Sequence, residues 1–145
     1  MNPQNAVHVP KSRIDEAIAM PPKQGKTELE PFKSLMKSLG VPFFILEDTQ
    51  VENNKVELHT HEADVWMCLE GESWFKLGGE MVDPFPSASN GAPNSKEMRS
   101  YELRDAETVV MKPGDWLWIP AGVPHQHGST GTARLMIFKI PNKDA

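Results

Sequence analysis

The sequence of 145 residues is poor in three features that mark particular classes of protein. Cys68 is the single cysteine, which excludes an internal disulfide and any scaffold held together by disulfides. Lysine and arginine total 15 against 20 aspartates and glutamates, and this formal net charge of −5 argues against the basic face of a nucleic-acid binder. No apolar run approaches the roughly 20 residues of a membrane-spanning helix.

The first residues also lack the basic start and the apolar stretch of a secretory signal peptide. Together with the single cysteine, this favours a soluble cytoplasmic protein. We therefore expect a cytoplasmic location, no nucleic-acid partner and no membrane partner. The length of 145 residues suits one domain with one sizeable core.

Residues 1–40 form an N-terminal arm that shows no strand pattern. After a polar start, an amphipathic pattern predicts a short helix from Ser12 to the two prolines at 21–22. Residues 23–29 are expected to be a linker to a second short helix, from Pro31 to Leu39. Neither helix is long enough to be stable alone, so the arm should pack on the main domain or on a partner.

From Val41 onward the apolar periodicity is that of strands. Many short strands with Gly and Pro turns predict an all-β sandwich or barrel. The segment 78–100 is rich in Gly, Pro, Ser and Asn, so we expect a long loop: a lid, a subunit contact or a plain surface loop. The expected strands are 41–46, 56–61, 65–69, 74–77, 101–103, 107–111, 116–119, 125–127 and 133–140.

Two separate stretches carry histidines in a pattern that suggests a metal site. His59 and His61 are two residues apart, so they would share a face of one extended strand. A carboxylate follows at Asp64. Far downstream, the stretch from Gly114 to His125 contains a strand, a Pro-x-Gly turn and a third histidine where the next strand begins.

The two stretches together resemble the paired motifs of the cupin superfamily. Asp64 and Gly71 have the six-residue gap of the first motif, and Gly114 to His125 fits the second throughout. Two departures stand out. Only two residues separate His61 from Asp64, fewer than is usual in the family, and Ser129 stands where the second motif ends in Asn.

This resemblance implies an all-β fold, the double-stranded β-helix or jelly-roll barrel of cupins, over residues 41–141. The arm 1–40 precedes the barrel and a tail, 142–145, follows it. Cupins include dioxygenases, isomerases, lyases and decarboxylases, so the resemblance narrows the fold and the metal more than the reaction. Single-domain cupins also commonly form dimers.

The predicted metal ligands are His59, His61, Asp64 and His125, in the mouth of the barrel. Imidazoles with one carboxylate suit a divalent transition metal such as Fe, Mn, Ni or Zn, and the sequence does not choose among these ions. The offset of Asp64 from His61 is odd, so a regular strand would point Asp64 away; a bulge at residues 62–63 would restore the parity. Without that bulge, Asp64 would not bind the metal and would instead accept a hydrogen bond from the N–H of a metal-bound imidazole.

His127 and Asp64 are the candidate catalytic groups. His127 would share a face with His125, as a general acid or base, as a fourth ligand, or as an unliganded histidine at the rim. Cys68 and the four tryptophans are expected in the core, with one or two tryptophans near a ligand. The candidate cations for an anionic substrate are Lys76, Arg99, Arg104 and Arg134.

The leading hypothesis is a small mononuclear non-haem metalloenzyme, with dioxygenase-, isomerase- or lyase-type chemistry on a small polar or anionic molecule. The alternative is a non-catalytic cupin that binds a small ligand. We also expect a homodimer, in which the arm of each chain packs across the other barrel and buries its apolar stripes.

Overall fold

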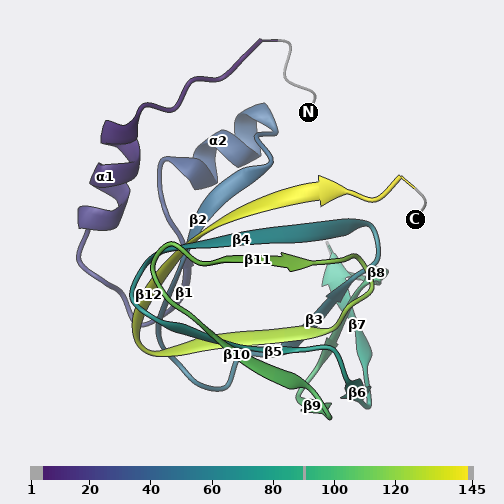
Figure 1. Ribbon diagram of the computed structural model, residues 1–145. Helices are drawn as coiled ribbons and strands as arrows, with labels where there is room; N and C mark the ends of the chain where they lie inside the picture. Colours follow the sequence, from purple (N-terminus) through teal and green to yellow (C-terminus); the bar gives the residue numbers. More distant parts are fainter. Residues whose placement is uncertain (1–4, 90, 144–145) are drawn as a thin grey trace.

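The computed structural model describes residues 5–89 and 91–143 (Figure 1). The expectations for residues 1–4 of the arm and 144–145 of the tail lie outside these residues. Within them, two helices and twelve strands follow one another. None of these helices is long and apolar enough to cross a membrane.

Two curved antiparallel sheets form the barrel, and the long strand β12 (His125–Pro141) belongs to both. The first sheet follows the order β1 (Gly25–Glu28), β2 (Phe43–Val51), the second part of β12, β4 (Glu62–Glu70) and β11 (Trp116–Ile119). The second follows the order β10 (Glu107–Met111), β5 (Ser73–Leu77), the start of β12, β3 (Val56–His59), β8 (Ala92–Ser100) and β7 (Phe85–Ser89). The predicted all-β jelly-roll cupin barrel is confirmed.

Strand β12 passes from one sheet to the other at Gly128, where no side chain fits. A Cβ at this position would collide with the Val51 carbonyl oxygen and with the Trp74 ring. Strand β12 pairs with β5 up to this residue and with β2 from Ser129 onward. A glycine is therefore required where the two layers join.

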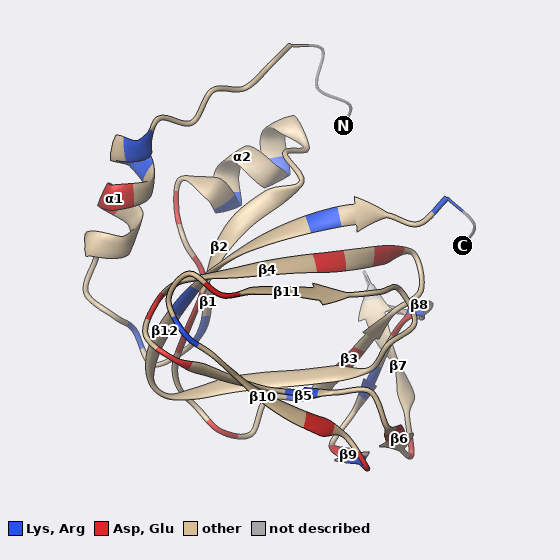
Figure 2. Ribbon diagram, in the orientation of Figure 1, with Lys and Arg blue, Asp and Glu red and all other residues tan. Residues whose placement is uncertain are grey.

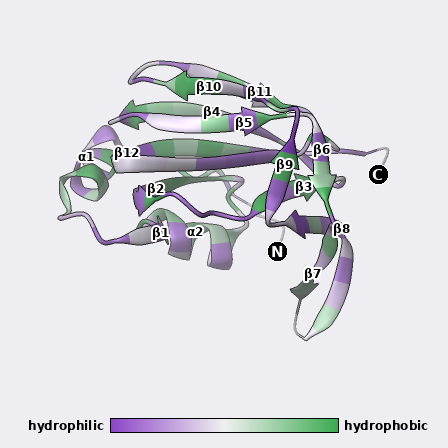
Figure 3. Cartoon of the chain, turned by 90° about the horizontal axis from the view of Figure 1, so that it is seen from below, coloured by the Kyte–Doolittle hydropathy of each residue, from purple (hydrophilic) through white to green (hydrophobic). Residues whose placement is uncertain are grey.

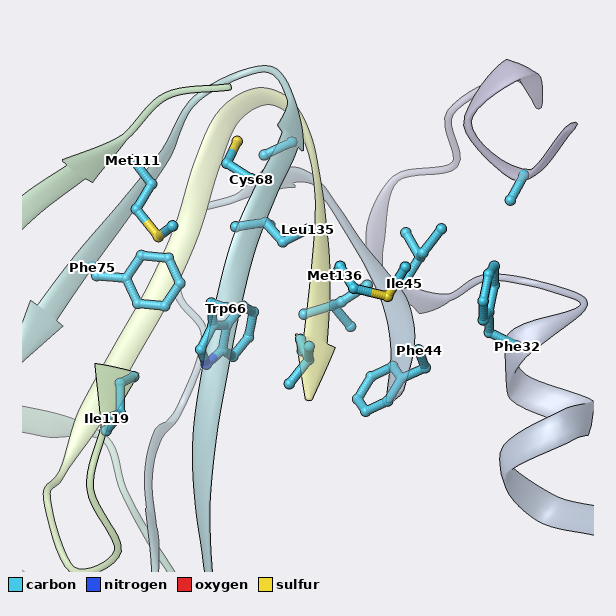
Figure 4. Close-up of a cluster of buried hydrophobic side chains, with 14 residues drawn as sticks. Phe32, Phe44, Ile45, Trp66, Cys68, Phe75, Met111, Ile119, Leu135 and Met136 are labelled. Carbon is cyan, nitrogen blue, oxygen red and sulfur yellow. The ribbon is translucent and has the colours of Figure 1, made fainter. Parts of the chain in front are cut away.

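The main core fills the space between the two sheets (Figure 4). Trp66 of β4 meets Phe75 of β5 edge to face, with ring centroids 5.0 Å apart. Cys68 is buried there as a small apolar residue, as expected, and burial raises the pKa of its thiol. The inward residues of both sheets thus form one continuous apolar layer.

The N-terminal arm packs on the outer face of its own barrel, beside β2 (Figure 1). The two predicted helices are confirmed as α1 (Lys11–Ala19) and α2 (Phe32–Leu39). Phe32 is fully buried and lies edge to face on Phe43 of β2, with centroids 6.1 Å apart. Phe32 and Ala17 thus find cover on the chain's own barrel, whereas Leu39 at the end of α2 is exposed.

The linker expected over 23–29 is wrong, because β1 lies within it and pairs with β2 from Gly25↔Thr49 to Glu28↔Leu46. Its pairing with the neighbouring strand, and not its own composition, makes this short segment a strand. The polar residues Gly25, Lys26, Thr27 and Glu28 gave no apolar signal that could have revealed it.

The buried side chain of Arg134 anchors the arm to the barrel. Its Nε donates to Glu47 Oε1 at 2.8 Å and its Nη1 to Glu70 Oε1 at 2.7 Å. The same guanidinium donates to the carbonyl oxygens of Ile18 and Met20 at the end of α1. Arg134 is therefore committed to holding α1, and we call this group, Arg134 with Glu47 and Glu70, the arginine clamp.

The long loop expected over 78–100 is also wrong. It contains β6 (Glu80–Val82), β7 and β8, and the β7–β8 hairpin projects away from the barrel (Figure 3). Strand β6 forms a small ladder with β9 (Glu102–Arg104). The prolines misled the prediction, since Pro86 and Pro93 lie in a hairpin at the sheet edge, where a missing N–H is tolerated.

Candidate metal centre

The predicted ligands lie around a bend between β3 and β4. His59 is the last residue of β3, the chain bends at Thr60 and His61, and β4 begins at Glu62. The bulge expected at residues 62–63 is wrong, because β4 pairs with β12 without a register shift there. Instead, the bend at Thr60 and His61 changes the side to which the following residues point, so that Asp64 faces His59.

Four side-chain atoms converge between the two sheets. Asp64 Oδ2 lies 3.7 Å from His59 Nε2 and 3.7 Å from His125 Nε2. Glu57 Oε2 lies 3.6 Å and 3.8 Å from the same two nitrogens. We call these four residues, Glu57, His59, Asp64 and His125, the mouth cluster. Acidic and basic stretches gather at this end of the barrel, where β3, β4 and β8 meet (Figure 2).

Three of these atoms are buried and have no hydrogen-bond partner among the described residues: His59 Nε2, His125 Nε2 and Asp64 Oδ2. Their side chains are 7%, 1% and 1% exposed. Burying a polar atom without a partner costs about 1–3 kcal/mol. Such a group of unpaired buried atoms is typical of a site that binds water, an ion or another ligand.

The second nitrogen of each imidazole is held in place. His59 Nδ1 donates to Glu97 Oε2 at 2.6 Å, and His125 Nδ1 donates to the Val123 carbonyl at 3.0 Å. Burial lowers the pKa of His125 from 6.5 to about 4, although Val123, Glu57 and Asp64 oppose this. His125 is thus neutral near pH 7, with its Nε2 lone pair toward the cluster, as a metal ligand requires.

Each carboxylate of the cluster is fixed by a lysine on its other oxygen. Lys139 Nζ lies 2.7 Å from Asp64 Oδ1, and Lys26 Nζ donates to Glu57 Oε1 at 2.9 Å. Burial would raise the pKa of Glu57, but Lys26 and nearby histidines outweigh it and hold that pKa well below its usual range. Burial would lower the pKa of Lys139, but Asp64 and Glu62 raise it.

His61 lies beside the cluster and faces a different pair of carboxylates. Its Nε2 is 3.3 Å from Glu97 Oε1 and 3.6 Å from Glu62 Oε2, and its side chain is 34% exposed. Its Nδ1 is buried without a hydrogen-bond partner among the described residues. The structure therefore brings His59, Asp64 and His125 together and places His61 at the rim.

His127 is fully buried and has a partner on each ring nitrogen. Its Nδ1 donates to Asp48 Oδ2 at 2.6 Å, and Asn54 Nδ2 donates to its Nε2 at 3.2 Å. The ring lies between Trp66 and Phe75, at centroid distances of 4.9 and 5.6 Å. His127 is not among the residues that line the cavity at the barrel mouth.

A cavity of about 490 Å³ reaches the mouth cluster at Glu57 and His59, whereas Asp64 and His125 are not among its lining residues. The rim cations Lys26 and Arg99 also line it. Its apolar lining includes Phe44, Leu46, Trp66 and Ile137. The space is therefore suited to a small molecule with both a polar and an apolar part.

Of the four candidate cations, Arg99 lines this cavity, where its Nη1 donates to Glu97 Oε2 at 3.1 Å. Arg104 is exposed beside Glu102, Lys76 lies over the Trp74 ring, and Arg134 belongs to the arginine clamp. The sequence named Arg99 without a reason to prefer it, because its place in the cavity depends on the unpredicted strand β8.

The family comparison agrees with this barrel. The JmjC domain family matches residues 23–140, which is most of the sequence. The chain belongs to the JmjC domain family. No curated protein matches it. The matched residues include β1 as well as the barrel strands.

Three solved structures resemble this JmjC domain. The epoxidase of hydroxypropylphosphonic acid from S. wedmorenis, in complex with fosfomycin, is 15% identical over 79% of this chain and 50% of that chain, with a TM-score of 0.48. A predicted oxalate decarboxylase from Thermotoga maritima is 16% identical over 81% and 79%, with a TM-score of 0.44. Drosophila melanogaster CENP-C, bound to CAL1, is 11% identical over 68% and 64%, with a TM-score of 0.44.

This JmjC domain thus spans about half of the epoxidase chain and under two thirds of the CENP-C chain. At these identities the likeness concerns the fold alone.

The mouth cluster fits a metal ion by size and by donor type. Nitrogen and oxygen ligands lie about 2.0–2.2 Å from a transition metal. Two donor atoms 3.6–3.8 Å apart can share one ion between them. Three donor atoms, from Glu57, His59 and His125, lie within 4.8 Å of one another.

Sequence reasoning missed Glu57, Glu97 and the two lysines. Glu57 had a signal, because it lies two residues before His59 and so on the same face of β3. Glu97 had none, since it reaches His59 only through the β3–β8 pairing. The expectation that every tryptophan is in the core is wrong for Trp116 and Trp118, which are 63% and 54% exposed.

Proposed function

We propose that this JmjC domain is a mononuclear metalloenzyme that acts on a small molecule in the barrel mouth. The observation that carries the proposal is the convergence of three buried, unpaired donor atoms, from His59, Asp64 and His125, beside a cavity of about 490 Å³. This donor set suits a divalent transition metal such as Fe, Mn, Ni or Zn. When bound, such an ion supplies a Lewis acid with open positions for a substrate or dioxygen.

The protein side chains around this site have separate roles in the proposal. His59, Asp64 and His125 hold the ion, and Lys139 positions Asp64 through its contact with Oδ1. Arg99 at the rim offers donors to an anionic group of the substrate. In this proposal His127 is a positioning residue, held by its bond to Asp48, and the expected roles as acid, base or fourth ligand stay predictions.

The reaction belongs to the dioxygenase, isomerase or lyase type, on a small polar or anionic substrate. The test has two stages. First, metal analysis of freshly purified protein should find about one ion per chain, and His59→Ala and His125→Ala should each lose it, while the exposed His8→Ala should keep it. Wild-type stoichiometry in His125→Ala would contradict the site.

The second stage separates an enzyme from a small-molecule binding protein. Protein reconstituted with Fe(II) without oxygen is screened for oxygen uptake with catechols, thiols and keto acids. Uptake that His125→Ala abolishes supports the oxygenase form of the proposal. Binding of a compound with neither uptake nor any product, for every compound that binds, would favour the non-catalytic alternative.

We also propose a homodimer in the cytoplasm, and the outer face of β4, β11 and β12 supports the dimer. Trp116 stacks on Phe138 with a centroid distance of 6.1 Å, and both Trp116 and Trp118 face solvent. Strand β11 carries no charge (Figure 2). Helix α2 covers the β2 part of the same sheet, whereas nothing in the described chain covers this part.

Such a solvent-exposed aromatic face on an edge strand is typical of a protein–protein contact. Sedimentation of the full chain should give a dimer at micromolar concentration. The double variant Trp116→Glu with Trp118→Glu should give a monomer, because it places four charges in a symmetric interface. Tyr101→Glu, at an exposed aromatic residue elsewhere, is the control and should remain dimeric. A monomeric wild-type chain would contradict the dimer.

A further inference from the structure

We propose that Glu57 is a protein ligand of the metal centre and takes the place that the cupin motif gives to His61, with Lys26 as its positioning residue. The inference rests on the proposed function, since it concerns the same centre. It departs from the first cupin motif, which begins at His59 and so does not include Glu57.

The geometry of Glu57 matches that of Asp64. Its Oε2 lies 3.6 Å from His59 Nε2 and 3.8 Å from His125 Nε2, against 3.7 Å and 3.7 Å for Asp64 Oδ2. The two carboxylates thus approach the same pair of nitrogens at equal distances. An ion held by the imidazoles and Asp64 would also lie within reach of Glu57.

The atoms that the mouth cluster directs to its centre favour a cation there. Two carboxylate oxygens face two imidazole nitrogens, and three of these four atoms, all but Glu57 Oε2, are buried without a hydrogen-bond partner among the described residues. Lys26 compensates Glu57 from the outer side, at Oε1, and leaves Oε2 directed inward. A surface ion pair alone would not explain this orientation, since the Glu57 side chain is only 13% exposed.

His61 is engaged away from this centre. Its Nε2 contacts Glu97 and Glu62, which lie on the rim side of His59. The chain bends between His59 and His61, so the two rings do not project from one strand face, and their centroids are 6.2 Å apart at 84°. The rings of His59 and His125, by contrast, lie 5.2 Å apart.

Two imidazoles and two carboxylates define the class of ion. The two carboxylates match the charge of a divalent ion on their inner oxygens, while Lys26 and Lys139 bind their outer oxygens. A second carboxylate in place of a third imidazole shifts the preference toward harder ions. The inference therefore names Mn(II) or Fe(II) as the resident ion rather than Zn(II) or Ni(II).

Lys26 connects the centre to the arm. It belongs to β1, which is paired with β2, and its ammonium reaches across to β3. A change in the docking of β1 would therefore alter the position of a metal ligand. Lys26 acts on the metal only through Glu57. Replacing Lys26 should therefore lower metal affinity to the extent that Glu57 loses its orientation.

The test is Mn(II) binding by metal-free full chain, followed through the EPR signal of free Mn(II). Glu57→Gln should weaken binding at least about tenfold, while His61→Ala should stay within about threefold of wild type. Glu28→Gln is the matched control, a carboxylate that lines the same cavity outside the cluster, and it should also stay within about threefold. Lys26→Met should weaken binding, and Lys26→Arg should restore it.

Electron spin echo spectra of the Mn(II) protein count the coordinated imidazoles. They distinguish Glu57 from His61 as the ligand if Glu57→Gln and His61→Ala both bind Mn(II) weakly. Two imidazoles, unchanged in His61→Ala, support the inference, and a third that His61→Ala removes overturns it. Loss of binding in His59→Ala with none in Glu57→Gln would overturn this inference alone. A wild-type chain that binds neither Mn(II) nor Zn(II) would overturn the proposed function itself. Circular dichroism of each metal-free variant checks folding, and Lys26→Met replaces Glu57→Gln if the latter is unfolded.

Discussion

Two clusters of buried charge lie in one barrel, and they differ in whether their polar atoms are paired. In the arginine clamp, every nitrogen of the Arg134 side chain that carries hydrogen donates to an oxygen of Glu47, Glu70 or the end of α1. In the mouth cluster, two imidazole nitrogens and one carboxylate oxygen have no partner among the described residues. The first arrangement is complete without a ligand, and the second is not.

This difference distinguishes charged residues that stabilise the fold from charged residues that are suited to bind a ligand, and it uses the structure of this chain alone. A saturated charged cluster has no capacity left for another molecule, so its purpose is to join parts of the chain. An unsaturated one is a standing cost to stability, which a protein retains where a ligand offsets it. Arg134 and Arg99, two of the four cations that the sequence offered as anion-binding candidates, illustrate both cases.

The largest expected effect comes from breaking the clamp. Arg134→Met should destabilise the chain by about 3–5 kcal/mol, because it leaves Glu47 buried without its cation and frees the end of α1. Denaturant unfolding measures this loss. Arg104→Met, at an exposed arginine, should change stability by less than about 0.5 kcal/mol. Equal losses of stability in Arg134→Met and Arg104→Met would mean that the clamp does not stabilise the fold.

Breaking the mouth cluster should affect metal binding and leave the fold intact. His125→Ala should lower metal affinity at least about a hundredfold, because a direct ligand contributes more than the roughly 10–100-fold of an outer partner. The metal-free variant should still fold, with a free energy of unfolding below that of the metal-free wild type, because the change leaves a cavity and removes the hydrogen bond to Val123. A metal titration and an unfolding curve on the same sample check the metal affinity and the fold. A His125→Ala variant that is unfolded, or that keeps its metal affinity, would contradict the prediction.

Saturating the mouth cluster should stabilise the wild-type chain and not the variant. An ion at a hundredfold excess over its dissociation constant adds about 2.7 kcal/mol. Thermal unfolding with and without a chelator should therefore show a higher midpoint for the metal-loaded protein. His125→Ala should show no such difference, and Arg134→Met should keep it at a lower midpoint.

Much of the fold and part of the site were predictable from the sequence. The strands at Glu107–Met111 and Trp116–Ile119 match their predicted bounds, because apolar periodicity and flanking turns mark them. The periodicity could not tell which face of β11 is inside, since Trp116, Leu117, Trp118 and Ile119 are all apolar. The predicted core position of Trp116 and Trp118 is therefore wrong.

The site was predictable where it depends on local spacing and unpredictable where it depends on pairing. His59, Asp64 and His125 come from motifs that the sequence displays. Glu97 reaches the site through a hairpin whose prolines resembled a loop, and Lys26 through a strand with no apolar signal. The parity argument for Asp64 required a bulge, whereas a bend two residues earlier gives the same result.

The smallest expected effect, and the one that sharpens the contrast most, is that of Asp64→Asn. Asparagine keeps the shape of aspartate and an oxygen that can bind a metal, but it loses the negative charge that Lys139 and the ion share. Metal affinity should therefore fall about tenfold, less than for His125→Ala, and Asp64→Ala should cost as much as His125→Ala. Metal titration of the three variants decides this. If Asp64→Ala also lowers metal affinity only about tenfold, Asp64 is not a direct ligand but a hydrogen-bond partner of a metal-bound imidazole. The unpaired Asp64 Oδ2 would then not mark a metal ligand.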